Sequence, residues 1–526
     1  MPLTASERRL VDSAASWFDA NHERFVNELC DLIRYPSVAD ESDPSPKPAE
    51  PYGHEVRRVF DHMIGKAGRD GFPTHDYDGH VLEVAYPQDD VETGDDIAFV
   101  GHLDVVPAGP GWTHDAFEPR VIDGDTVIGR GSLDDKGVSL VNYSLLRFFN
   151  EQGHRFRHRV RVLFGGSEEP ALNDIKWFVH NVGAPHQAIV TDGPFPVNNI
   201  QKGLLDVDVA LPVGKRLRGW HAGSSANTIP AVASIDLVGT DADEVRQAVD
   251  HAGLDDDTRG RITITSSDDA DDGGVTITAH GISGHASKPD GTINAIALLT
   301  SVLTKSGLLD GRDAEAAAAI AGWAGDPYGG ALGFAFENTE SGPTTGNLGI
   351  IMPGPEFGTD AEDHAVPSDA IVMHLDIRYA VGQKSEDILA AIRRHVEPLG
   401  GRLVNVLNDD PYYVPADDFR VELLTGAYND VIAGMAPSTP PARPVAMGGG
   451  THARFIPGAL NFGPEFHTEY VPAVDGIVMD PPECITPGTG SAHGIDEWVS
   501  IRNLKAAFVM YALGLVRLDQ YLDGGN

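Results

Sequence analysis

Four polar clusters in this sequence carry residue types that could bind metal ions. Imidazole and carboxylate ligands together suit zinc, manganese or cobalt, and two histidines with three carboxylates are enough to hold two ions that share one carboxylate. A fifth candidate, His493, lies in the C-terminal part of the chain. The four clusters are residues 101–104 with His102 and Asp104, 129–137 with Asp134, 165–169 with Glu168 and Glu169, and 191–193 with Asp192.

The adjacent carboxylates Glu168 and Glu169 fit a division of roles in hydrolysis. Paired metal ions can lower the pKa of a water molecule and polarise a carbonyl. A glutamate that is not bound to metal can then take the proton of the water and pass it to the leaving nitrogen. Neighbouring residues in a strand or loop point in different directions, so one of the pair can bind metal while the other acts as the base. Asp104, two residues beyond His102, fits a partner that fixes the tautomer of the imidazole.

The segments between these clusters predict the elements that must position them. Residues 97–100, 160–164 and 188–190 are short apolar runs typical of buried strands, and residues 138–149 have apolar side chains at helical spacing. Strands that alternate with helices predict an α/β fold with a mainly parallel sheet and helices on both faces. Because ligands bind where the carboxyl ends of such strands converge, the four clusters can meet in one crevice.

The pattern changes after about residue 203. Residues 204–211 and 371–379 alternate apolar and polar side chains, which predicts half-exposed antiparallel strands. The α/β pattern returns after about residue 410. We therefore predict a catalytic domain formed by residues 1–203 and 411–526, interrupted by an inserted α+β domain at residues 204–410. The insert is at the upper end of the size of one lobe, so two lobes in tandem are the alternative.

Charge and composition exclude several functional classes. The 526 residues include 78 Asp and Glu against 39 Lys and Arg, a formal net charge of −39. Such a charge repels phosphate backbones, so we expect no nucleic-acid partner. No apolar stretch approaches the ~18 residues of a membrane span, and the N-terminus lacks the apolar core of a signal peptide. With only two cysteines, we expect a soluble cytoplasmic protein without a membrane partner, either a monomer or a homodimer.

The motifs, in this order and spacing, resemble the dinuclear-zinc exopeptidase and deacylase family, which includes acetylornithine deacetylase, succinyl-diaminopimelate desuccinylase, carboxypeptidase G and carnosinase. The PepV-type bacterial dipeptidases are the most similar branch, and the resemblance runs from about residue 20 to the C-terminus. The motifs are Gly-His-Leu-Asp-Val-Val-Pro around His102, Gly-Arg-Gly-Ser-Leu-Asp-Asp-Lys-Gly around Asp134, the pair Glu168 and Glu169, Phe195-Pro196, Lys202-Gly203, and Asn-Phe-Gly-Pro at residues 461–464.

The resemblance implies two divalent metal ions, zinc or in its place manganese or cobalt, that are held by five side chains. It also implies that Glu168 is the general base and then the general acid, and that the peptide bond between Asp134 and Asp135 is cis. The implied metal ligands are His102 and Asp192 for one ion, Glu169 and His493 for the other, and Asp134 as the bridge.

The same resemblance favours a small peptide as the substrate. An aspartate at the position of Asp192 goes with dipeptidases and aminopeptidases, whereas deacylases usually carry glutamate there. We therefore expect cleavage of dipeptides or short peptides, with an N-acyl-amino-acid deacylase or related amidohydrolase as the alternative. His285, in the family's lid, would reach over the substrate carbonyl and stabilise the oxyanion. The implied substrate-binding residues are Asn227, Arg378, Gly450 and Arg454.

Two features depart from the family pattern. Pro170 follows the glutamate pair where relatives have a small residue and glycine, and residues 466–487 look like an extra loop. These departures concern the substrate range more than metal binding. A third hypothesis is a metal-dependent binding protein that has lost catalysis, but the presence of Glu168 argues against it.

Overall fold

The computed structural model divides the chain into two compact units. Unit 1 consists of Met1–Asn199, Tyr413–Val445 and Gly450–Asn526, and unit 2 consists of Ile200–Tyr412 and Ala446–Gly449. The structure describes residues 3–43, 45–88, 91, 95–238, 240–267, 274–357, 366–467, 474, 476–486 and 488–522. The extra loop at 466–487 is therefore described only in part.

A nine-stranded sheet runs through unit 1, with the order β1-β2-β6-β3-β7-β22-β8-β20 and β21 beside β8. Its central strands β6, β3, β7 and β22 are parallel, while β1, β2 and β8 pair antiparallel on either side. This arrangement confirms the mainly parallel α/β fold. The strands are β1 (Thr74–Tyr77), β2 (Val81–Ala85), β6 (Arg159–Gly165), β3 (Asp96–His102), β7 (Gln187–Val190), β22 (Leu460–Asn461), β8 (Asn198–Gln201), β20 (Tyr412–Tyr413) and β21 (Val445–Met447).

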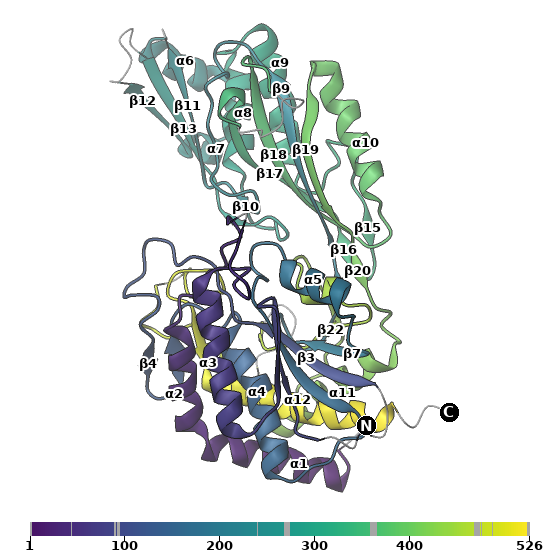
Figure 1. The fold of residues 1–526 in the computed structure, drawn as a ribbon. Coiled ribbons are helices and arrows are strands. Elements are labelled where there is room, and N and C mark those ends of the chain that lie inside the picture. The colour runs from purple at the N-terminus through teal and green to yellow at the C-terminus, as the bar shows by residue number, and fades with distance from the viewer. Residues whose placement is uncertain are drawn as a thin grey trace. The chain divides into compact units, whose positions relative to one another are not determined.

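Helices cover this sheet, as Figure 1 shows for α4 and α12 near the parallel strands. A small antiparallel sheet, β23-β5-β4, completes unit 1. Within the described residues, no helix is both long and apolar enough to cross a membrane. The elements are α1 (Ala5–Ala20), α2 (His22–Ile33), α3 (His54–Asp70), α4 (Lys136–Glu151), α5 (Asn173–Asn181), α11 (Phe419–Met435), α12 (Ile501–Tyr521), the 3₁₀ turn η4 (His452–Phe455), β23 (Trp498–Ser500), β5 (Thr126–Ile128) and β4 (Arg120–Ile122).

The two faces of β3 pack against different helices, because successive side chains of a strand point to opposite sides. Phe99 lies against Tyr511 of α12, with ring centroids 5.7 Å apart. Its neighbours Ala98 and Val100 belong to a buried cluster with Phe178 of α5. The apolar run that predicted this strand is therefore buried on both sides, which leaves its carboxyl end as the place where polar residues can be used.

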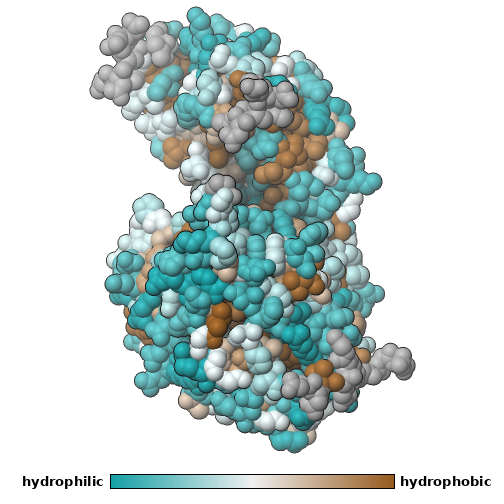
Figure 2. All heavy atoms as spheres, in the orientation of Figure 1, coloured by the Kyte–Doolittle hydropathy of each residue, from teal (hydrophilic) through white to brown (hydrophobic). Residues whose placement is uncertain are grey.

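Unit 2 contains a four-stranded sheet, β17-β18-β9-β19, and a three-stranded sheet, β11-β13-β12. Alternate residues of β13 are buried, and they share one core with α8 and α9. In Figure 2 hydrophilic residues predominate on the visible surface, as the composition leads one to expect. The elements are β9 (Gly203–Pro212), β10 (Thr228–Ile229), β11 (Val232–Val238), α6 (Ala242–His251), α7 (Asp256–Gly260), β12 (Ile262–Ser267), β13 (Gly274–His280), β14 (Gly284–His285), α8 (Ala295–Ser306), α9 (Gly311–Gly325), β15 (Glu337–Asn338), β16 (Gly342–Pro343), β17 (Thr345–Pro353), β18 (Ala370–Tyr379), α10 (Ser385–Val396) and β19 (Arg402–Asp409).

Candidate metal centre

The carboxyl ends of three neighbouring parallel strands bring the polar clusters together. His102 is the last residue of β3, and the other side chains lie on the segments that follow β6, β7 and β5. In two groups the possible ligand atoms lie within 4.8 Å of one another: His102 with Glu168 and Asp192, and His102 with Asp134 and Glu169. The geometry thus places the predicted base, Glu168, among the predicted ligands.

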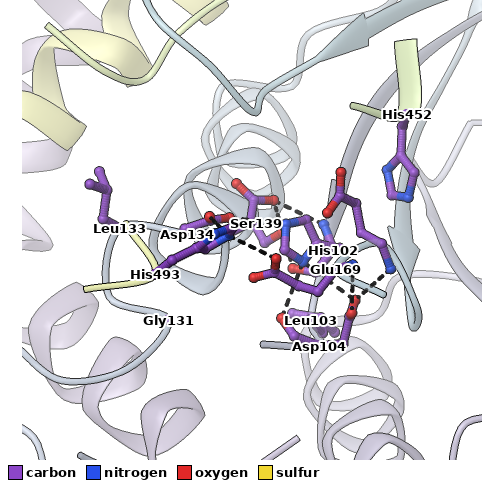
Figure 3. Close-up of polar contacts among 12 residues, drawn as sticks. His102, Leu103, Asp104, Gly131, Leu133, Asp134, Ser139, Glu169, His452 and His493 are labelled. Atoms are coloured by element: carbon purple, nitrogen blue, oxygen red, sulfur yellow. Dashed lines mark hydrogen bonds and ion pairs between the residues drawn. The ribbon is translucent and has the colours of Figure 1, made fainter. Parts of the chain in front are cut away.

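His493 joins this group from the segment before β23. Its Nε2 lies 2.8 Å from Oε2 of Glu169 and 3.1 Å from Oδ2 of Asp134, the contact drawn in Figure 3. The imidazole is 58% exposed, whereas His102 is fully buried and the side chain of Asp134 is 14% exposed. The five side chains that the resemblance implied as ligands therefore lie in one cluster, although they come from positions 102 to 493. Their assignment to particular ions stays a prediction.

Asp104 orients both sides of the cluster. The Nδ1 of His102 lies 3.1 Å from the backbone oxygen of Asp104, so a proton on Nδ1 is donated there and Nε2 is left to face the carboxylates. The Asp104 carboxylate accepts the backbone N–H groups of Glu168 and Glu169, each at 3.1 Å. Asp104 thus fixes both the glutamate pair and the imidazole. Its contact with the imidazole was expected from the sequence, and its contacts with the glutamates were not.

The peptide bond between Asp134 and Asp135 is cis, as the resemblance implied. The Asp135 carboxylate turns away from Asp134 and accepts hydrogen bonds from the backbone N–H of His102 at 2.9 Å and from the hydroxyl of Ser139 at 3.0 Å. The two neighbouring aspartates therefore have different roles. Asp134 faces the metal centre, and Asp135 holds the end of β3 that carries His102.

Glu497 is a supporting residue that the sequence analysis missed. It is fully buried, and its Oε1 accepts the backbone N–H groups of Leu133 and Asp134 at 2.9 and 3.1 Å. Its Oε2 is paired with Arg130 at 2.6 Å, and Arg130 also donates to the backbone oxygen of His493 at 3.1 Å. This ion pair fixes the loops of two predicted ligands. A single glutamate more than 350 positions away offers no local sequence signal for such a role.

His452 and Asp174 form a second missed pair next to the centre. Both are fully buried, and Nε2 of His452 lies 3.1 Å from each carboxylate oxygen of Asp174. Asp174 also accepts the backbone N–H of Ser167 at 3.1 Å, directly before Glu168. The glycine-rich turn at 448–450 was the only local signal that pointed to His452, which lies beside His102 in Figure 3.

The carboxylates of the centre repel one another in a buried setting. Burial, together with the charge of Asp134, raises the pKa of Asp192 to about 8. Burial and neighbouring carboxylates also raise the pKa of Glu168 and that of Glu169. Oε1 of Glu169 is buried and has no hydrogen-bond partner among the described residues. The donor set and the excess of carboxylates over imidazoles therefore fit divalent transition-metal ions.

In unit 2 the structure brings His285 and Asn227 together. Thr228 of β10 pairs with His285 of β14, and the backbone N–H of Ala286 donates to the backbone oxygen of Asn227 at 2.8 Å. The Nδ1 of His285 accepts the backbone N–H of Ser287 at 3.1 Å. In the neutral ring the proton is therefore on Nε2, which makes that nitrogen a hydrogen-bond donor. The role of these two residues toward substrate stays a prediction.

Arg378 is buried and already bound to an acidic neighbour. Its guanidinium forms a two-pronged pair with Asp376 at 2.7 and 2.8 Å and donates to the backbone oxygen of Gly448 at 2.9 Å. These contacts use three of the five N–H donors of arginine, so up to two can face a substrate carboxylate. In unit 1, a side chain at Gly450 would lie 3.0 Å from the guanidinium of Arg454, so the glycine makes room for that group.

The model of the Peptidase family M20/M25/M40 matches residues 98–516. The chain belongs to this family. It is a metallopeptidase, with a catalytic core in the fold described above. The protein named "Putative dipeptidase YtjP" of Bacillus subtilis is 25% identical over 508 residues, which is 94% of this chain and 97% of that protein. "Putative dipeptidase SSP1012" of Staphylococcus saprophyticus is 27% identical over 462 residues, 85% of this chain and 90% of that protein.

Solved structures show the same fold at low sequence identity. Human carnosine dipeptidase 1 has a TM-score of 0.53 and 14% identity, and the match covers 97% of this chain and all of that chain. The dipeptidase Dug1p of Saccharomyces cerevisiae has a TM-score of 0.53 and 13% identity, with 97% and 98% covered.

Proposed function

We propose that this metallopeptidase hydrolyses dipeptides and short peptides. The observation that carries the proposal is the cluster of partly buried carboxylates around His102, whose mutual repulsion makes it a site for divalent cations. The names of the two bacterial relatives support dipeptides as the substrate. Aspartate at position 192, where deacylases of the family usually carry glutamate, supports peptide cleavage over N-acyl-amino-acid deacylation.

In this proposal His102 and Asp192 hold one ion, Glu169 and His493 hold the other, and Asp134 is shared between them. When bound, two such ions polarise the scissile carbonyl and lower the pKa of a water molecule. We propose zinc, with manganese or cobalt as alternatives. Asp104 keeps Nε2 of His102 unprotonated toward the centre by accepting the Nδ1 proton.

Glu168 performs the proton transfers. It takes a proton from the attacking water and delivers it to the nitrogen of the leaving amine, so that the tetrahedral intermediate breaks down to acid and amine. Asp104 positions Glu168 by accepting its backbone N–H, and burial keeps the carboxyl ready to hold the proton between the two steps.

Unit 2 supplies the remaining groups in the proposal and acts as a lid. The Nε2–H of His285 donates to the oxyanion. Asn227 and Arg378 bind the substrate, with Arg378 directed to its carboxylate, and Gly450 and Arg454 of unit 1 contribute to the same task. We propose that the enzyme works in the cytoplasm as a monomer or a homodimer, in keeping with its two free cysteines.

The experiment is a metal-dependence assay with a substrate panel. The full chain is stripped with a chelator, supplied with zinc, manganese or cobalt, and assayed on dipeptides and on N-acyl amino acids, while bound metal is measured on the same samples. We expect dipeptide hydrolysis only with metal and at most weak deacylation. Preferred cleavage of N-acyl amino acids would favour the alternative activity, and silence on every amide with metal bound would contradict both.

A further inference from the structure

A cavity of about 240 Å³ lies in unit 1, and its lining includes residues that neighbour the predicted metal ligands. Two of its lining residues are chain neighbours of predicted ligands: Leu133 precedes Asp134, and Ser491 lies two residues before His493. Figure 3 shows Leu133 on the side of Asp134 that faces away from His102. The lining of the cavity therefore includes residues next to two predicted ligands in the chain.

Glu465 connects the cavity to the third strand end of the centre. It lines the cavity, and its backbone N–H donates to the oxygen of Gly193 at 3.1 Å, next to Asp192. The lining of the cavity thus includes neighbours of Asp134, Asp192 and His493, which places the cavity next to the metal centre.

The outer wall belongs to the extra loop that the sequence analysis found at 466–487. Its described residues Phe466, Val478 and Met479 line the cavity. The loop backbone is held to α12, because Asn503 accepts the N–H of Val478 at 2.9 Å and donates to its oxygen at 2.6 Å. The side-chain amide of Asn503 therefore fixes this part of the loop through two hydrogen bonds to its backbone.

Several polar side chains of the lining already have protein partners. The hydroxyl of Ser500 donates to Asp125 at 3.0 Å, that of Thr489 donates to a backbone oxygen at 2.8 Å, and Glu465 is paired with His467. The cavity surface left for a ligand is mainly apolar. It is provided by Leu133, Phe466, Val478, Met479, Trp498 and Leu504.

We propose that this cavity receives an apolar side chain of the substrate next to the scissile bond and makes the enzyme selective for dipeptides with a large aliphatic or aromatic residue. The inference rests on the proposed dipeptidase function and adds its specificity. Differences of one to several methylene groups in an apolar pocket change kcat/KM by roughly 10- to 200-fold. We therefore expect at least about tenfold higher kcat/KM for leucine- or phenylalanine-containing dipeptides than for Gly-Gly.

The test uses the metal-loaded full chain and the dipeptides Gly-Gly, Leu-Gly, Phe-Gly, Gly-Leu and Gly-Phe. Met479→Trp fills the cavity and is expected to reduce the ratio of kcat/KM for the preferred apolar dipeptide to that for Gly-Gly by about tenfold. Ile477→Trp is the matched control, because Ile477 lies on the same loop and outside the lining, and it should leave the ratio unchanged. Thermal unfolding of both variants checks that they fold.

If Met479→Trp does not fold, Met479→Ala serves instead. It enlarges the cavity and should raise kcat/KM for phenylalanine dipeptides relative to leucine dipeptides. A wild-type enzyme that cleaves Gly-Gly as well as the apolar dipeptides, or a ratio that Met479→Trp leaves unchanged, would overturn the specificity inference while the dipeptidase function stands. Failure to cleave any dipeptide with metal bound would instead overturn the proposed function.

Discussion

Unit 1 contains two buried groups of charged side chains with opposite electrostatics. In the first group, which lies between α2, α3 and α4, the carboxylates Glu28 and Asp70 contact the cations Arg147 and Lys66. The two contacts of Glu28 are 2.5 and 2.6 Å long. Although burial alone would raise it, these partners hold the pKa of Glu28 at about 2, and the pKa of Asp70 is lowered as well. The metal centre contains two imidazoles, those of His102 and His493, which lower the pKa of Asp134 although burial opposes this. Burial and neighbouring carboxylates raise the pKa values of Glu168, Glu169 and Asp192.

This difference separates a structural charge cluster from a functional one. In the cluster between α2, α3 and α4, Arg147 and Lys66 neutralise the carboxylates, so this cluster can contribute to folding in the absence of any ligand. The metal centre has more carboxylates than imidazoles, so part of its negative charge is left for bound cations or protons to offset, and such perturbed groups in one place are typical of active sites. Substitutions in the first cluster should therefore change stability, and substitutions in the second should change metal binding or catalysis.

The largest effect is expected for Glu168→Gln. The amide keeps the size of the side chain but cannot accept and return a proton, so kcat should fall by about 10³-fold, within the usual range for a lost general base. Bound metal, measured by elemental analysis, should stay at the wild-type level because Glu168 is not one of the five predicted ligands. A variant that retains substantial turnover would remove Glu168 from the role of base.

Arg147→Met tests the structural cluster. It leaves Glu28 and Asp70 without their main cation, and breaking a largely buried pair in this way should lower the free energy of unfolding by about 3 kcal/mol. Denaturant unfolding measures this loss, and kcat of the folded variant should stay at the wild-type value. Arg24→Ala is the matched control, because Arg24 contacts the same two carboxylates but is 43% exposed, and it should cost less than about 0.5 kcal/mol. Equal losses in the two variants would contradict the distinction.

Metal removal should destabilise the protein through the centre alone. When the concentration of a cation is a hundred times its dissociation constant for the folded state, its binding adds about 2.7 kcal/mol to the free energy of unfolding. Chelator-treated protein should therefore melt at a lower temperature than protein with zinc restored. In Asp192→Asn the stabilisation by zinc should be smaller, because one predicted ligand is lost. An unchanged melting temperature on removal of bound metal would show that the surplus charge is tolerated without a cation.

The sequence predicted the local features of this site well. The apolar runs located the strands, and the residues directly after them, such as His102 and Asp192, are the ones that meet. The pairing of Arg378 with Asp376 could also have been predicted, because residues two apart on a strand share a face. In contrast, Glu497 acts on residues more than 350 positions away, and His452 contacts Asp174 across 278 positions. Such pairs depend on tertiary packing, which local patterns do not encode.

The smallest expected effect concerns a third charge group, in unit 2, that resembles the metal centre in its residue types. His374 of β18 lies 2.7 Å from Asp208 and 3.5 Å from Asp206 on β9, and only 23% of its side chain is exposed. Although burial opposes it, the two carboxylates raise the pKa of His374 to about 10. Here a single imidazolium pairs directly with both carboxylates, so we expect this group to act like the structural cluster despite its composition.

The sign of the pH dependence follows from that shift. Between the unfolded pKa of about 6.5 and the folded pKa of about 10, the folded state holds a proton that the unfolded state has lost. The contribution is therefore complete below pH 6.5, falls as the pH rises toward 10, and is absent above it. Allowing for solvent screening, we expect His374→Gln to lower the free energy of unfolding by about 1–2 kcal/mol at pH 6 and by much less near pH 10. Denaturant unfolding across this range measures the difference. A loss of stability that grows with pH would mean that His374 is neutral in the folded protein. The group would then not act like the structural cluster.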